Sequence, residues 1–120
     1  MIVDKANELI GKPYDLDSYN CYHLVRELVP EAPTPQEILK YAVHFRNTGE
    51  ILKPNLIEIV EENRQDGNIV FLGSMVNEAP HAGVVVLNYI VHADRPSVKA
   101  SSLEAISQIY NERRYYRCLK

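Results

Sequence analysis

Apolar residues recur at every third or fourth position through the first part of the chain, a spacing typical of amphipathic helices. The pattern predicts helices over residues 1–10, 21–28 and 36–46. Gly11 ends the first helix, and the second is followed by Pro30, Pro33 and Pro35, since proline cannot continue a helix. Residues 56–62 fit either a short helix or a strand.

After Asp66 the apolar positions change to the short, β-branched runs that are typical of strands. The pattern predicts strands over residues 69–72, 81–87, 89–93, 97–100 and 115–119, a loop over 73–80, and a small helix that begins at Ser102. Asn88 and Tyr89 are expected to form a tight hairpin turn. Helices followed by an antiparallel meander predict an α+β fold, with a single domain over residues 1–120 and N-terminal helices packed on a small antiparallel sheet.

Cys21 is expected in the first turn of its helix, with Asn20 or Ser18 as the cap. A helix N-terminus presents unpaired N–H groups and a partial positive charge, which stabilise a thiolate and lower the pKa of a thiol. The same N–H groups can hold an oxyanion. A lone cysteine is more often a small buried apolar residue, so both interpretations of Cys21 stay open at this point.

The predicted hairpin places His81 at the start of one strand and His92 near the end of its partner. These positions lie at the same end of an antiparallel pair, so the two imidazoles are expected to be neighbours. A thiol nucleophile needs a base, and the base needs a polar group that fixes its ring. Cys21, His81 and His92 supply such a set, with His92 as the orienting group. Each histidine is also compatible with a structural role.

The same three residues are a candidate zinc set, because cysteine and histidine are the ligands that zinc prefers. The sequence pairs none of them at the close spacing typical of zinc sites, such as Cys-x-x-Cys or His-x-x-x-His. We therefore expect neither a metal nor another cofactor.

Charge narrows the classes of partner. The formal net charge is −3 and no cluster of Lys and Arg interrupts it, so nucleic acid is not an expected partner. The acidic residues Glu58, Glu61 and Glu62 are expected to form a solvated face, and Arg113 with Arg114 a solvated turn.

The cysteine count and the N-terminus give two further expectations. The two cysteines, Cys21 and Cys118, are too few for a disulfide framework, and Cys118 is expected to be structural. Polar residues at positions 4–8 interrupt the apolar run near the N-terminus, so neither a secretory signal nor a membrane span is expected. The product is therefore expected to be cytoplasmic as synthesised.

Five short motifs stand in order along the chain: Gly11-x-Pro13-Tyr14, Tyr19-Asn20-Cys21-Tyr22-His23-Leu24-Val25, Asp66-Gly67-Asn68-Ile69-Val70-Phe71, His81-Ala82-Gly83-Val84-Val85-Val86 and Val91-His92-Ala93. Together they resemble the NlpC family of papain-like cell-wall peptidases, in particular the small variant found in phage and prophage tail assembly proteins. The resemblance covers most of the chain.

This resemblance implies a papain-like, NlpC-type fold and a Cys-His-His triad. Cys21 would be the nucleophile, His81 the general base and acid, and His92 the residue that orients His81. The Tyr14 hydroxyl would line the oxyanion side together with the N–H of Cys21. The activity implied is that of a cysteine peptidase or amidase that cleaves peptide bonds in peptidoglycan stem peptides without a cofactor. Phage or prophage tail proteins would be its partners, and a phage particle would deliver it.

The chain departs from the family pattern at several positions. Asn20 and Asn68 stand where the family commonly has Asp, and His23 stands where a small residue is common. His23 is expected to narrow the cleft or to contact substrate. The departures leave two alternatives open: a papain-like hydrolase or acyltransferase with another amide or ester substrate, and a non-catalytic tail or scaffold domain.

Overall fold

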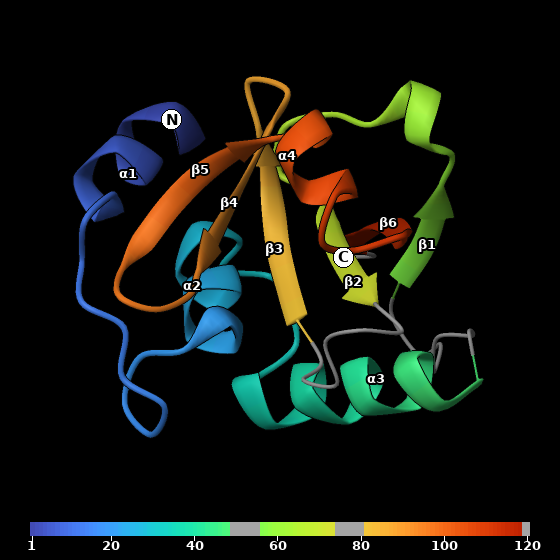
Figure 1. The fold of residues 1–120 in the computed structure, drawn as a ribbon, viewed down its shortest axis with the longest axis horizontal. Helices are drawn as coiled ribbons and strands as arrows, with labels where there is room; N and C mark the ends of the chain where they lie inside the picture. Colours follow the sequence, from blue (N-terminus) through green and yellow to red (C-terminus); the bar gives the residue numbers. More distant parts are fainter. Residues whose placement is uncertain (49–55, 74–80, 119–120) are drawn as a thin grey trace.

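The computed structural model describes residues 1–48, 56–73 and 81–118 (Figure 1). These residues have an α+β fold with four α-helices and a six-stranded antiparallel sheet. The helices are α1 (Ile2–Leu9), α2 (Cys21–Leu28), α3 (Pro35–Thr48) and α4 (Leu103–Ser107). The strands are β1 (Leu56–Ile59), β2 (Ile69–Gly73), β3 (His81–Val86), β4 (Tyr89–Ala93), β5 (Val98–Ser102) and β6 (Glu112–Cys118). None of the described helices is long and apolar enough to cross a membrane.

The strands of the sheet lie in the order β1-β6-β2-β3-β4-β5. Strands β2 to β5 follow one another as an antiparallel meander, which agrees with the predicted layout. The last strand, β6, returns to the free side of β2 and carries β1 on its outer edge. Local sequence patterns do not predict this return, because it depends on pairing between segments far apart along the chain.

Both faces of the sheet are buried, and successive side chains of each strand point to opposite faces. On one face Ile69 and Phe71 of β2 belong to the core that includes residues of α1, α2 and α3. On the other face Val70 and Leu72 pack in a smaller core with Ile106 of α4. Figure 1 shows α2 and α4 on opposite sides of the sheet. This double burial explains why residues 69–72 read as a continuous apolar run instead of an alternating one.

Most predicted elements are observed, with differences at their ends. Helix α3 begins at Pro35 and continues to Thr48, beyond the predicted residues 36–46. Residues 56–62, which fitted a helix or a strand, form β1 and a 3-10 helix, Glu61–Asn63. Gly73 ends β2, and the remaining residues of the predicted loop, 74–80, lie outside the described residues, as does residue 119 of the last predicted strand.

The hairpin turn between β3 and β4 is formed by Leu87 and Asn88, not by Asn88 and Tyr89 as predicted. The φ angles of Leu87 and Asn88 are 49° and 67°. A two-residue hairpin turn of type I′ requires positive φ at both positions, and Val86 then pairs directly with Tyr89. The backbone N–H of Leu87 donates to a carboxylate oxygen of Asp66 at 2.8 Å, which ties the turn to the entry of β2.

One prediction about surface charges is wrong, and another is incomplete. Arg113 and Arg114 lie in β6, not in a turn, because this strand begins at Glu112. The Nε of Arg113 donates to Glu61 at 2.8 Å, and that of Arg114 donates to Glu58 at 2.7 Å. Glu58 and Glu62 are exposed, as expected for a solvated face. Glu58 and Glu61 also join β1 and its 3-10 helix to β6 through these ion pairs.

Candidate active site

The start of α2 is held by a capping box built from Asn20 and His23. The side-chain oxygen of Asn20 accepts hydrogen bonds from the backbone N–H groups of Tyr22 and His23, at 3.0 and 3.3 Å. In return, the backbone N–H of Asn20 donates to Nδ1 of His23 at 3.2 Å. Asn20 is thus the cap and Ser18 is not. His23 serves this cap and is not among the described residues that line the nearby pocket, which corrects the expectation that it narrows the cleft.

Cys21 is the first residue of α2, and only 5% of it is exposed. Burial raises the pKa of its thiol to about 12, while hydrogen bonds from the backbone N–H groups of Ala82 and Cys21 and from the side chain of Tyr22 act in the opposite direction. The N–H group at the helix N-terminus acts on this pKa in the expected direction, but desolvation is larger and the net shift is upward. In the resting protein the thiol keeps its proton at neutral pH.

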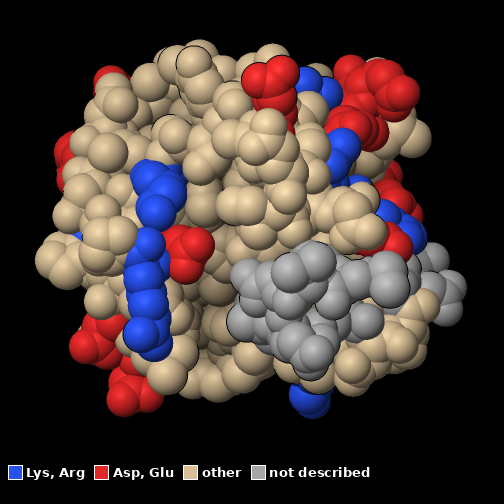
Figure 2. Space-filling view, viewed as in Figure 1, with Lys and Arg blue, Asp and Glu red and all other residues tan. Residues whose placement is uncertain are grey.

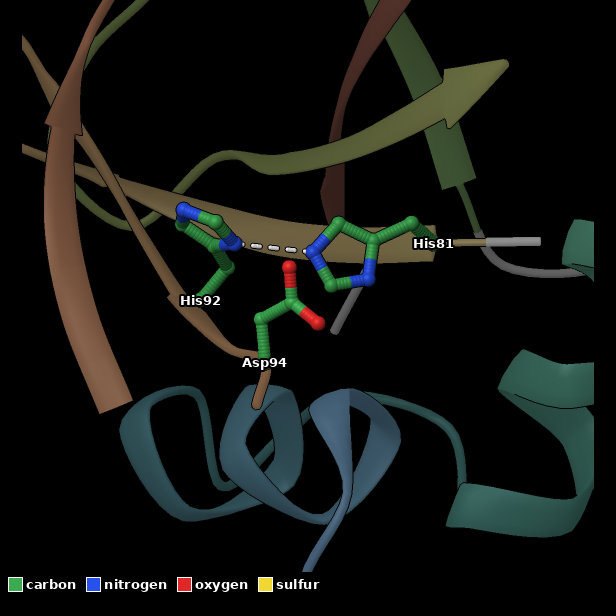
Figure 3. A group of neighbouring side chains, drawn as sticks. All are labelled: His81, His92 and Asp94. Atoms are coloured by element: carbon green, nitrogen blue, oxygen red, sulfur yellow. Dashed lines mark hydrogen bonds between the residues drawn. The ribbon is translucent and has the colours of Figure 1, made fainter. Parts of the chain in front are cut away.

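His81 and His92 are brought together by the β3–β4 hairpin, as the sequence predicts. His81 is the first residue of β3, and His92 is near the end of β4. The atoms His81 Nε2 and His92 Nδ1 lie 2.8 Å apart in a hydrogen bond, with the two ring planes at 83° (Figure 3). Both rings are buried, with 7% and 4% of each residue exposed. The bond leaves Nδ1 of His81 on the side of the ring away from His92.

Two residues that the sequence analysis does not single out hold this histidine pair. The Oγ of Ser101 lies 2.9 Å from Nε2 of His92, and the ring of Tyr110 stacks on that of His81 with 5.4 Å between centroids. Ser101 lies opposite Ile90 in the β4–β5 register, which makes it the diagonal neighbour of His92 on the same face. A single sequence carries no signal for this register, so neither contact could be predicted.

Burial also lowers the pKa values of both imidazoles, that of His81 to about 3 and that of His92 to about 4. The neighbouring His92 acts on His81 in the same direction as burial. The carboxylate of Asp94 opposes these effects on both rings, and Lys99 reinforces them. Both imidazoles are therefore neutral at pH 7, and each carries one ring proton.

A pocket of about 370 Å³ lies beside the thiol. Three of the predicted site residues, Tyr14, Cys21 and His81, line this pocket, and the fourth, His92, is bonded to His81. The other lining residues are Leu16, Asn20, Tyr22, Leu39, Ala93, Asp94 and Tyr110. Figure 2 shows this face of the molecule hollowed below the ends of β3 and β4. A neutral thiol and a neutral, oriented imidazole that share one pocket are suited to nucleophilic attack with general-base assistance.

Asp94 is a further residue of the site that the sequence analysis does not single out. It follows His92 by two positions, is half-buried and lines the pocket. The possible ligand atoms of His81, His92 and Asp94 all lie within 4.8 Å of one another. This group differs from the zinc set considered from the sequence, because it contains the carboxylate of Asp94 in place of the thiol of Cys21.

Gly83 determines how closely β3 and β4 approach beside the two histidines. A Cβ atom at this position would lie 2.9 Å from the backbone oxygen of Val91 and 3.3 Å from Cβ of His92. Gly83→Ala is expected to lower the free energy of unfolding by about 1–3 kcal/mol, because the backbone of β4 cannot move without breaking its pairing. Chemical denaturation measures this loss. An unchanged midpoint, with the His81–His92 bond retained in a crystal structure of the variant, would contradict it.

Comparison of the chain with protein-family models gives no match, and comparison with curated protein sequences gives none either.

Proposed function

We propose that the chain is a cysteine hydrolase with a papain-like, NlpC-type fold, and that it cleaves a peptide bond in the stem peptides of peptidoglycan. One observation carries the proposal. Cys21, at the N-terminus of a helix, shares a pocket with His81. The Nε2 of His81 is hydrogen-bonded to a second buried histidine, His92. A nucleophile, a base and a group that orients the base are the parts that covalent acyl transfer requires.

The hydrogen bonds of the two rings allow two arrangements of protons, and the proposed reaction uses the one that leaves a lone pair on Nδ1 of His81. His92 carries its proton on Nε2 and donates it to Ser101 Oγ, which leaves Nδ1 of His92 as an acceptor. His81 then donates its Nε2–H to His92. The remaining nitrogen of His81, Nδ1, holds a lone pair and serves as the base for the thiol of Cys21.

The reaction proceeds from a neutral thiol, because burial keeps the proton on sulfur. The proton passes to Nδ1 of His81 as the sulfur attacks the amide carbonyl carbon. His81 then gives this proton to the leaving amine, the C–N bond breaks, and a thioester with Cys21 remains. A water molecule that gives its proton to His81 attacks the thioester, and the acid product and the free thiol are released.

The oxyanion that forms during attack is stabilised by donors near the thiol. The backbone N–H of Cys21 belongs to the first turn of α2 and lies close to its own sulfur. The Tyr14 hydroxyl, on the same pocket, is the second donor in this proposal. Tyr22 hydrogen-bonds the Cys21 side chain and adds a third candidate donor, which the sequence analysis does not single out.

The choice of substrate rests on the motif resemblance and not on the pocket alone. In this proposal the stem peptide occupies the pocket that Tyr14 and Asp94 line, and no cofactor takes part. Phage or prophage tail proteins are the proposed partners, and delivery by a particle would bring the enzyme to the cell wall.

Digestion of muropeptides tests the substrate. Purified protein is incubated with muropeptides from diaminopimelate-type and lysine-type peptidoglycan in the presence of EDTA. The products are separated by chromatography, and their masses are measured by mass spectrometry. We expect new fragments cut within the stem peptide of at least one type. Intact muropeptides, together with hydrolysis of a lipid ester or thioester, would favour the alternative of a papain-like hydrolase or acyltransferase with another substrate.

One observation favours a second candidate, a non-catalytic scaffold domain. The thiol of Cys21 has its pKa raised to about 12, and such a thiol is inert unless a base assists it. Alkylation by iodoacetamide between pH 6 and pH 9 separates the two candidates, with Cys118→Ser as the background. A rate that falls in the His81→Gln variant supports catalysis. A slow rate that is unchanged by His81→Gln supports the scaffold.

Ser101→Ala is expected to lower kcat about 10-fold and to leave KM unchanged. The substitution leaves the Nε2–H of buried His92 without its partner, which costs about 1–3 kcal/mol. The proton of His92 is then no longer held on Nε2, so Nδ1 of His92 is less available to accept from His81. Ser101→Thr keeps the hydroxyl and is expected to restore most of the rate. Equal rates for the alanine and threonine variants would contradict this role of the hydroxyl.

A further inference from the structure

His81, His92 and Asp94 converge on one point beside the pocket. Their possible ligand atoms all lie within 4.8 Å of one another, and among the described residues no other three His, Cys, Asp or Glu side chains form such a group. Figure 3 shows a carboxylate oxygen of Asp94 beneath the line that joins the two bonded ring nitrogens. Two imidazole nitrogens and one carboxylate oxygen that share a centre are a common three-residue ligand set for zinc.

The spacing of the two nitrogens is close to what an ion needs. Two nitrogens on one tetrahedral Zn²⁺, with bonds of about 2.0–2.1 Å, lie about 3.3 Å apart. The observed distance between His81 Nε2 and His92 Nδ1 is 2.8 Å, so the two nitrogens would have to separate by about 0.5 Å and turn their lone pairs toward the ion. The ion would take the place of the hydrogen bond between the rings.

The surroundings of the group also fit a metal. A ligating histidine usually donates its other ring N–H to a fixed acceptor, and Ser101 Oγ lies 2.9 Å from Nε2 of His92. Asp94 is half-buried and lines the pocket, so an ion can reach the group from solvent. Mg²⁺ and Ca²⁺ prefer oxygen ligands alone, which makes a borderline ion such as Zn²⁺ the better match for two imidazoles.

We propose that His81, His92 and Asp94 bind one Zn²⁺ ion, and that the bound ion switches off the thiol site. Binding requires only these three residues, whereas the inhibition rests on the proposed function. The ion takes the lone pair of His92 Nδ1 and that of His81 Nε2. The proton of His81 moves from Nε2 to Nδ1, so no proton is lost from the pair. Nδ1 of His81 then has no lone pair with which to accept the proton of Cys21.

Isothermal titration of the metal-free full chain with zinc sulfate tests the binding. We expect one Zn²⁺ per chain with a Kd of about 10 µM or tighter. Asp94→Asn and His92→Gln are each expected to weaken binding at least 10-fold, and circular dichroism checks that both variants fold. Asp4→Asn, on the first turn of α1, is the matched charge control and is expected to bind as the parent does. Cys21→Ala is also expected to keep the ion.

Two results would overturn the binding site: a Kd weaker than about 1 mM, or binding that survives Asp94→Asn but is lost in Cys21→Ala. The muropeptide assay tests the inhibition separately. Zinc sulfate is expected to stop cleavage by the parent chain, and EDTA to restore it. Asp94→Asn, compared with its own rate in EDTA, is expected to need at least 10-fold more zinc for the same fractional loss. Cleavage that rises on addition of zinc would overturn the inhibitory role. If the parent cleaves no muropeptide without zinc, the proposed function fails while the titration still decides the metal site.

Discussion

Cys21→Ala is expected to reduce muropeptide cleavage by about 10⁴-fold or more. The substitution removes the atom that forms the thioester, and the remaining oxyanion donors and binding contacts supply only a small residual rate. Product formation measured by mass spectrometry under single-turnover conditions gives this ratio. Cleavage within 10-fold of the parent rate would remove Cys21 from the mechanism.

A matched control separates loss of the thiol from loss of the fold. Cys118→Ser removes the other thiol of the chain, which is half-buried in β6, and is expected to keep the parent rate. The free energy of unfolding of Cys21→Ala is expected to lie within about 1 kcal/mol of that of the parent, because the substitution deletes a single buried sulfur atom. If both variants lost activity equally, a structural explanation would replace the catalytic one.

Acid is expected to destabilise the fold by about 4 kcal/mol at pH 5 relative to pH 8. Burial holds the pKa of His81 at about 3 and that of His92 at about 4, below the usual value of about 6.5 that applies to the unfolded chain. Between these values the unfolded state binds more protons, so stability present above pH 6.5 is lost as the pH falls. Each ring contributes about 2 kcal/mol at pH 5, with Asp94 reducing the effect and Lys99 increasing it.

Urea denaturation at pH 5 and pH 8 in the presence of EDTA measures this difference. His81→Gln and His92→Gln are each expected to remove about half of the pH dependence, since each removes one buried imidazole. If the pH dependence persisted in the double variant His81→Gln/His92→Gln, titratable groups other than these two histidines would be its cause.

The hairpin and the helix that carry the site could be predicted because their signals are local. Helix α2 spans the predicted residues 21–28, since its apolar spacing and its cap lie within a few residues of one another. The neighbouring positions of His81 and His92 follow from two adjacent strands and a two-residue turn. The turn prediction was wrong by one residue, and the histidines remained at the same end of the sheet.

The features that could not be predicted depend on pairing across the chain. The pairing of β6 with β1 places Arg113 next to Glu61, which precedes it by 52 residues. Ser101 reaches His92 only through the register of β4 with β5. Tyr110 stacks on His81 from beyond α4. None of these contacts has a periodic signal in one sequence.

The pKa of Cys21 shows a different limit of sequence reasoning. The position of the thiol at the helix N-terminus was predicted, and that position alone would lower its pKa. The depth of burial depends on how α2 packs against β3, and this packing raises the pKa to about 12. Position within an element can be inferred from neighbouring residues, whereas desolvation is a property of the whole fold.

Trapping of the acyl-enzyme tests the central claim most directly. The full chain is mixed with a stem peptide that carries an activated amide at the scissile position, quenched in acid within milliseconds to seconds, and analysed by intact mass and peptide mapping. The expected result is a mass increase equal to the acyl part of the substrate, located on Cys21 and absent from Cys21→Ala. Turnover of the substrate with no adduct on Cys21, or with an adduct on another residue, would contradict the role of Cys21 as nucleophile.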